Sequence, residues 1–142
     1  MNEYSTFDII RILDIPRERL QDWMNRNFII PSIRKAEGKG TKNVFSRNDL
    51  YGIELFSFLI NNGIKRKVAS SLIKHLVAFD FDPMKCGEKI GLLPFISRPD
   101  LEKRGGFMYS DLLSVVEQTI DYDIAFLINL KNIYKKVDSK VE

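Results

Sequence analysis

The chain has 142 residues, of which 44% are hydrophobic and 29% charged, a balance that predicts a folded protein with a packed core and excludes a disordered one. Its longest apolar runs fall short of the roughly 20 residues that a membrane-spanning helix needs, and its polar start lacks the pattern of a signal peptide. A single cysteine, Cys86, and a single histidine, His75, exclude an intrachain disulfide and the common zinc ligand sets. We therefore expect a cytoplasmic protein with no membrane partner, metal or cofactor.

The charge is unevenly distributed along the chain. Residues 1–79 contain 13 Lys and Arg against 8 Asp and Glu, whereas residues 80–142 contain 9 against 11. The positive charge is densest in residues 34–47, where five cations are balanced only by Glu37. A solvated loop would account for such a segment, but dense positive charge of this kind is also what a polyanionic partner requires. The N-terminal half is therefore the place to look for an anion-binding surface.

Two short helices are predicted at the start of the chain. Ser5 and Asp8 have the spacing of a capping box, which predicts that a first helix starts there. Pro16 has no amide to lose at a helix start, and it predicts a second helix that runs to about Arg26. The apolar stripe of this second helix comprises Leu20, Trp23 and Met24. The short connection predicts that the two helices cross steeply, as in a helix-turn-helix.

A basic, glycine-containing segment follows the second helix. Asn27 can adopt the left-handed conformation that ends a helix, and Phe28–Ile30 is a brief apolar stretch halted by Pro31. Residues 32–43 are polar and basic, and Val44-Phe45 restores apolar character. This pattern predicts two short strands around a flexible basic tip, the arrangement called a wing.

Two further helices are predicted before the amino-acid composition of the chain changes. Ser46 and Asp49 form a second capping box, which opens a helix that Asn62-Gly63 ends. A fourth helix is predicted over Lys65–Ala78, with a broad apolar face. The break at Asp80-Phe81-Asp82-Pro83 indicates a domain boundary near residue 80.

The second half is predicted to be a small α+β domain. Its expected elements are strands at Leu92–Ser97 and Gly106–Tyr109, a helix at Ser110–Ile120, a buried strand at Asp123–Ile128 and a helix at Leu130–Val137. The fold class expected for the whole chain is mainly α with a small α+β part. It comprises a four-helix winged helix-turn-helix domain over residues 1–79 and an α+β domain over residues 80–142.

The order of elements in the first half resembles the MerR-like regulators. The matching residues are Leu20 and Trp23 in helix two, Asn27-Phe28 and Pro31 after it, and then Phe45-Ser46, Asp49-Leu50 and Asn62-Gly63-Ile64. The match covers about half of the chain, from Tyr4 to Leu76. The resemblance implies a transcriptional regulator that binds double-stranded DNA and dimerises on two half-sites. The metal-sensing members use C-terminal cysteines and a long dimer helix, which this sequence lacks, so we do not expect a metal sensor.

Helix two is the expected reader of the bases. On its exposed face, Gln21 can pair with adenine and Asp22 can accept a hydrogen bond from cytosine. Arg17 or Arg19 can reach guanine or a phosphate, and the sequence does not decide which.

The remaining expected DNA contacts lie on the wing and at the start of helix four. The wing lysines supply charge with little geometric discrimination, so we expect them to add affinity rather than specificity. The position of the family's wing arginine is Asn43 here. A second cluster can contact phosphate from the start of helix four, although an ordinary solvated helix end is an equally good interpretation. The residues in question are Lys35, Lys39, Lys42 and Asn43 on the wing, and Lys65, Arg66 and Lys67 on the helix.

We expect no enzyme, because the sequence shows no nucleophile–base pair, phosphate-binding loop or metal-ligand spacing, and so predicts no catalytic residue. The alternatives to a regulator are a protein-interaction module and an excisionase-like architectural DNA-binding protein. The second domain is expected to serve self-association or partner binding, and a small-molecule effector is equally compatible with it.

Overall fold

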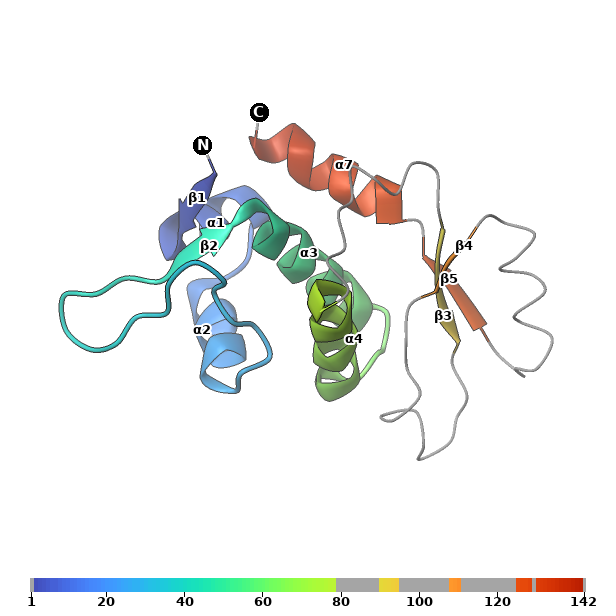
Figure 1. The fold of residues 1–142 in the computed structure, drawn as a ribbon, viewed down its shortest axis with the longest axis horizontal. Helices are drawn as coiled ribbons and strands as arrows, with labels where there is room; N and C mark the ends of the chain where they lie inside the picture. Colours follow the sequence, from blue (N-terminus) through green and yellow to red (C-terminus); the bar gives the residue numbers. More distant parts are fainter. Residues whose placement is uncertain (1, 79–89, 95–107, 111–124, 129, 142) are drawn as a thin grey trace.

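The computed structural model describes residues 2–78, 90–94, 108–110, 125–128 and 130–141, and this part of the chain is mainly helical, as expected (Figure 1). Its helices are α1 (Thr6–Leu13), α2 (Arg17–Asn25), α3 (Arg47–Asn61), α4 (Arg66–Ala78) and α7 (Leu130–Val141). Its strands are β1 (Glu3–Ser5), β2 (Val44–Ser46), β3 (Ile90–Pro94), β4 (Met108–Ser110) and β5 (Ala125–Ile128). The strands form two small antiparallel sheets, of order β1-β2 and β4-β3-β5.

Both predicted capping boxes are present. At the start of α1, the Ser5 amide donates to Asp8 Oδ2 over 2.9 Å, and the Asp8 amide donates to Ser5 Oγ over 3.2 Å. At the start of α3, Ser46 and Asp49 make the same reciprocal pair, also over 2.9 Å and 3.2 Å. Each box satisfies amides that have no partner within the helix, so both helices begin where their sequences predict.

Helix α2 ends in a left-handed turn at Asn27, as its sequence predicts. Asn27 has a φ of 60°. Its amide donates to the Met24 carbonyl over 3.0 Å, and the Phe28 amide reaches back to the Trp23 carbonyl over 2.9 Å. This pair of bonds is a Schellman motif, which satisfies the last carbonyls of a helix and reverses the chain direction.

The turn at Asn27 gives a stability prediction. A left-handed conformation costs an alanine about 1–2 kcal/mol, whereas glycine adopts it freely. We expect Asn27→Ala to lower the free energy of unfolding by about 1 kcal/mol, and Asn27→Gly to match or exceed the wild type. Urea denaturation of the three proteins measures this. Equal midpoints for the alanine and glycine variants would contradict the role of the positive φ.

The strand expected at Phe28–Ile30 does not form. The chain makes a series of bends there, because the Schellman turn pulls the Ile29 amide back to the Trp23 carbonyl and Ile29 itself is buried. Between residues 32–43 and β2, the only ladder contact is an isolated bridge. In this bridge the Arg34 amide donates to the Val44 carbonyl over 3.1 Å, and the Val44 amide donates to the Arg34 carbonyl over 2.8 Å. The main partner of β2 is instead β1, which the sequence analysis did not predict.

The pairing of β1 with β2 anchors the start of the chain. Tyr4 lies opposite Phe45 in the antiparallel register, and both side chains are buried. Because β2 runs directly into α3, this two-stranded sheet fixes the end of the basic segment against the helical core.

The helical core is centred on Trp23 of α2 and Phe56 of α3. Their rings meet edge to face with centroids 4.8 Å apart, and both side chains are fully buried. Helix α4 packs on α3 through buried residues that include Leu72 and Ile73. These contacts fix α2, the predicted reading helix, to the rest of the unit.

The three strands of the second sheet lie where the sequence predicts strands, but their first and last residues differ from the predicted ones. The strand expected at Leu92–Ser97 is β3, which begins and ends earlier, and the strand expected at Gly106–Tyr109 is β4. The strand expected at Asp123–Ile128 is β5, which pairs antiparallel with β3. The helix expected at Ser110–Ile120 lies outside the described residues apart from Ser110, which ends β4.

Helix α7 packs against α1 and α3, across the boundary predicted at residue 80 (Figure 1). It extends to Val141, beyond the predicted end at Val137. The ring of Tyr134 meets that of Tyr51 on α3 with centroids 4.8 Å apart. The buried face of α7 comprises Leu130, Ile133, Tyr134 and Val137. The last helix of the chain therefore shares a core with the first.

A polar cluster joins α3 to α7. Arg47 Nη2 lies 2.8 Å from Asp138 Oδ1, and the Tyr51 hydroxyl also donates to Asp138. Arg47 Nε donates to the Tyr51 hydroxyl over 3.1 Å. Burial raises the pKa of Tyr51, and the hydrogen bond to Asp138 raises it further, so the phenol is neutral and serves as a donor.

Candidate nucleic-acid interface

Helix α2 presents a polar face to the solvent, as its sequence predicts. Arg17, Arg19 and Gln21 are exposed, while Leu20 and Trp23 on the opposite side are buried. The Gln21 amide donates to Asn25 Oδ1, one turn further on, over 3.1 Å. Two exposed amides thus stand in a row along the helix, and each can exchange this bond for one to another polar partner.

Asp22 is paired with Arg26, a residue that the sequence analysis did not select. Arg26 Nε lies 2.9 Å from Asp22 Oδ1, with side chains 62% and 46% exposed. An exposed pair of this kind contributes at most about 1 kcal/mol, so it can open when a stronger partner is offered. The spacing of four residues between an acid and a following arginine on a helix is the signal that could have identified Arg26.

The segment of residues 32–43, called the basic loop from here on, carries the predicted lysines on its surface. Lys35, Lys39 and Lys42 are all exposed. The tip is closed by Thr41, whose hydroxyl accepts from the Glu37 amide over 2.7 Å and donates to a backbone carbonyl over 2.9 Å. The lysines therefore project from a turn with defined hydrogen bonds.

Asn43 holds the base of the basic loop. Its Oδ1 accepts from the Ala36 amide over 2.8 Å, and its Nδ2 lies 3.8 Å from the sulfur of Met24 on α2. The side chain is half-buried. Its polar atoms thus bond within the chain, where they join the loop to α2, and this positioning role differs from the predicted contact with DNA.

A polar groove lies between α2 and the basic loop. Its volume is about 340 Å³, and its lining includes Gln21 and Asn25 from the helix and Lys35 and Asn43 from the loop. The structure therefore brings together Gln21 and Lys35, which the sequence analysis had placed on separate elements. An amide pair and an ammonium group on one concave surface can bind a ligand that offers both hydrogen-bonding edges and negative charge.

A second depression joins α2 to the start of α4. Its volume is about 320 Å³, and it is lined by Arg19 together with Lys65 and Arg66. Gly63, with a φ of 89°, forms part of the same wall. Lys67 is exposed beyond this rim, and Lys39 and Lys42 line neither hollow. Arg19, Lys65 and Arg66 thus form a group that is separate from the lysines of the basic loop.

No family model matches this chain. No curated protein matches it either.

Two further observations bear on other function classes. Within the described ranges, no three His, Cys, Asp or Glu residues are grouped so that they could hold a metal ion. Among the same residues, no helix is both long and apolar enough to span a membrane. The side chain of His75 lies outside the described residues.

Proposed function

We propose that this protein is a sequence-specific DNA-binding transcriptional regulator. In this proposal α2 enters the major groove and the basic loop acts as the wing on the DNA backbone. The observation that supports it is the groove between α2 and the basic loop, whose lining includes Gln21, Asn25 and Lys35. The resemblance of the N-terminal half to the MerR-like regulators also supports it. The same resemblance favours a homodimer, because two copies match two half-sites of an operator.

Helix α2 has the side chains that reading bases requires. The major groove is about 12 Å wide, which admits one helix with its side chains. Gln21 releases its bond to Asn25 and offers its amide to adenine N6 and N7. When the Asp22–Arg26 pair opens, Asp22 can accept from cytosine N4 and Arg26 can donate to guanine or to a phosphate.

The two groups of cations suit the phosphates on either side of the groove. Arg19 and Gln21 are two residues apart, or about 200° around the helix, so they point to different sides of it. Lys35, Lys39 and Lys42 serve one DNA strand in this arrangement, and the group around Arg19 serves the other. Flexible ammonium groups track phosphate without selecting bases, so both groups contribute affinity rather than sequence preference.

The basic loop gives the first test. Lys39→Ala combined with Lys42→Ala is expected to weaken binding to all DNA sequences and to reduce the salt slope by about two units, near one for each phosphate that is no longer neutralised. Fluorescence anisotropy with a labelled duplex at several salt concentrations measures the slope. The matched control is Lys135→Ala with Lys136→Ala, two exposed lysines on α7. A salt slope equal to that of the control variant would show that the basic loop is not part of the DNA interface.

Gln21 gives the second test, which examines sequence preference. Selection from a random pool of duplexes is expected to return a motif for the wild type and a motif altered at one base pair for Gln21→Ala, since a good base contact contributes about 1–3 kcal/mol of discrimination. Identical motifs would reject Gln21 as a reader. Failure of the wild type to bind any duplex at low salt would reject the proposed function and favour a protein-interaction module instead.

A further inference from the structure

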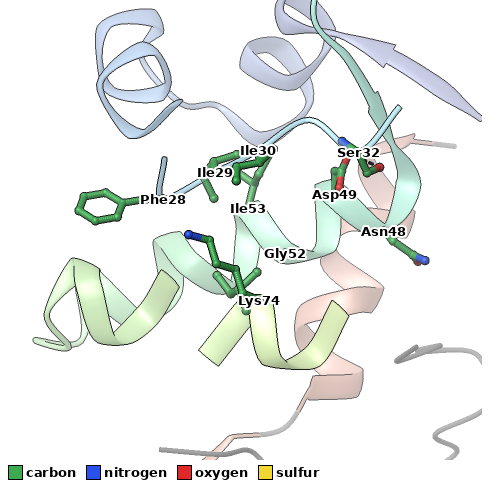
Figure 2. Close-up of a pocket in the computed structure, with 10 residues that line it drawn as sticks. Phe28, Ile29, Ile30, Ser32, Asn48, Asp49, Gly52, Ile53 and Lys74 are labelled. Carbon is green, nitrogen blue, oxygen red and sulfur yellow. Dashed lines mark hydrogen bonds between the residues drawn. The ribbon is translucent and has the colours of Figure 1, made fainter. Parts of the chain in front are cut away.

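An apolar pocket lies beside the polar groove between α2 and the basic loop, and Ile29 contributes to the lining of both. It has a volume of about 260 Å³ and is bounded by residues 28–32, α3 and α4 (Figure 2). This volume is close to the lower end of the roughly 300–1,000 Å³ that small-molecule pockets occupy. The pocket is therefore large enough for a small ligand and too small for a folded partner.

The walls of the pocket are made of branched aliphatic side chains. Ile29 and Ile53 are buried, whereas Ile30 is 50% exposed and forms an open edge. Gly52 lies inside α3, where a Cβ atom would be 3.3 Å from Ile73 Cγ2. A glycine inside a helix costs about 1 kcal/mol relative to alanine. Here it allows α3 and α4 to approach closely, and it leaves this wall without a side chain.

The two ends of the pocket differ in charge. Figure 2 shows Lys74 at one end and the Asp49–Ser32 pair at the other, with isoleucines between them. The Lys74 ammonium donates to the Asn27 carbonyl over 2.8 Å, which uses one of its three hydrogens. Within the described residues Lys74 has no carboxylate within ion-pair distance. The end at Lys74 can therefore accept an anion.

The opposite end of the pocket carries a hydrogen-bonded carboxylate. Asp49 Oδ2 accepts from the Ser32 amide over 2.9 Å, from the Ser32 hydroxyl over 2.8 Å and from the Ser46 amide over 2.9 Å. All three bonds reach one oxygen of the carboxylate and hold it at this end of the pocket. Its negative charge also repels a second carboxylate, which favours an anionic ligand oriented with its charge toward Lys74.

We propose that this pocket binds a small amphipathic monocarboxylate, with its carboxylate on Lys74 and its apolar tail against Ile29, Ile30 and Ile53. The pocket supplies apolar walls for the tail and one ammonium group for the head, as small-molecule sites commonly do. Lys74 also bonds to Asn27, the left-handed residue that follows α2, so the ligand head sits next to the turn that leads from the helix to the basic loop.

Titration with octanoate tests the proposal on the full chain without DNA. Isothermal calorimetry is expected to detect octanoate binding, with much weaker binding of octanamide, which has the same tail and no charge. Lys74→Met keeps an apolar stem and is expected to weaken octanoate binding by about tenfold or more, as loss of a charged hydrogen bond does. Lys136→Met, at an exposed position on α7, is the matched control and is expected to bind as the wild type does.

The location of the ligand is tested separately by NMR. Octanoate is expected to shift the methyl signals of Ile29, Ile30, Ile53 and Ile73 before those of isoleucines elsewhere. The proposal is overturned if the wild type binds no octanoate, if Lys74→Met or octanamide binds equally well, or if the shifted methyl groups lie outside the pocket. Because no DNA is present, these results do not depend on whether the protein proves to be a regulator.

Discussion

Replacing Trp23 with alanine is expected to lower the free energy of unfolding by about 3–5 kcal/mol, the usual loss when a large buried aromatic side chain is removed. Trp23 is 1% exposed and contacts Phe56 edge to face. It is also the main anchor of α2 in the core, so the variant is expected to lose the fixed position of the proposed reading helix. Urea denaturation followed by circular dichroism measures the change in stability.

Trp23→Phe is the matched control for this substitution. It retains a ring that can contact Phe56, so we expect a clearly smaller loss than for alanine. For Trp23→Ala, we also expect a lower DNA affinity at temperatures where that variant stays folded, because α2 is less firmly held. A loss of stability below about 1 kcal/mol for Trp23→Ala would contradict the packing described for this core.

Replacing Asp138 with alanine is expected to lower the free energy of unfolding by about 1–3 kcal/mol at neutral pH. The variant leaves Arg47 and Tyr51 without the acceptor that joins α3 to α7. Removing one partner of a partly buried network costs more than the net value of its hydrogen bonds, because the remaining donors stay desolvated. Arg47→Ala is the companion variant, and a smaller combined loss than the sum of the two would measure their coupling.

The same carboxylate gives an expected pH dependence. Burial alone would raise the pKa of Asp138, but the hydrogen bonds from Tyr51 and Arg47 outweigh burial and hold the pKa below its ordinary value of 3.8. Because the folded pKa is depressed, the carboxylate contributes its full stability above about pH 4, and this contribution is lost as the pH falls through the folded pKa. Asp138→Ala is therefore expected to be less sensitive to acid than the wild type.

Urea denaturation at a series of acidic pH values measures this difference. Some acid sensitivity is expected to remain in the variant, because the pKa of Asp8 is also lowered, mainly by the backbone hydrogen bond from Ser5. Parallel losses of stability in the wild type and in Asp138→Ala as the pH falls would contradict the assigned role of Asp138.

Elements with local signals could be predicted from the sequence. The capping pairs at Ser5 and Ser46 act over three residues, and the structure confirms both. Strand β1 could not be predicted in this way, because its three residues form a strand only through pairing with β2 about 40 positions later. Phe28–Ile30 gave the opposite error: its composition favours a strand, but the hydrogen bond from Ile29 to Trp23 holds the chain in a bend.

The candidate interface could be predicted only in part for the same reason. The exposed face of α2 follows from helical periodicity, so Gln21 and Arg19 could be selected from the sequence. The groove that joins Gln21 to Lys35 depends on how the basic loop folds back on α2, and no local pattern encodes it. Asn43 shows the limit most clearly, since its contact with Met24 joins the basic loop to α2, a separate element of the sequence.

The docking of α7 on α1 and α3 means that the helical unit is discontinuous in sequence, because residues 2–78 and 130–141 build it together. A fragment cut at residue 79 would expose to water the apolar faces that Leu130, Ile133 and Val137 cover. A shortened form suited to binding studies therefore needs α7 rejoined to α4 by a linker, rather than removed with the remainder of the second half.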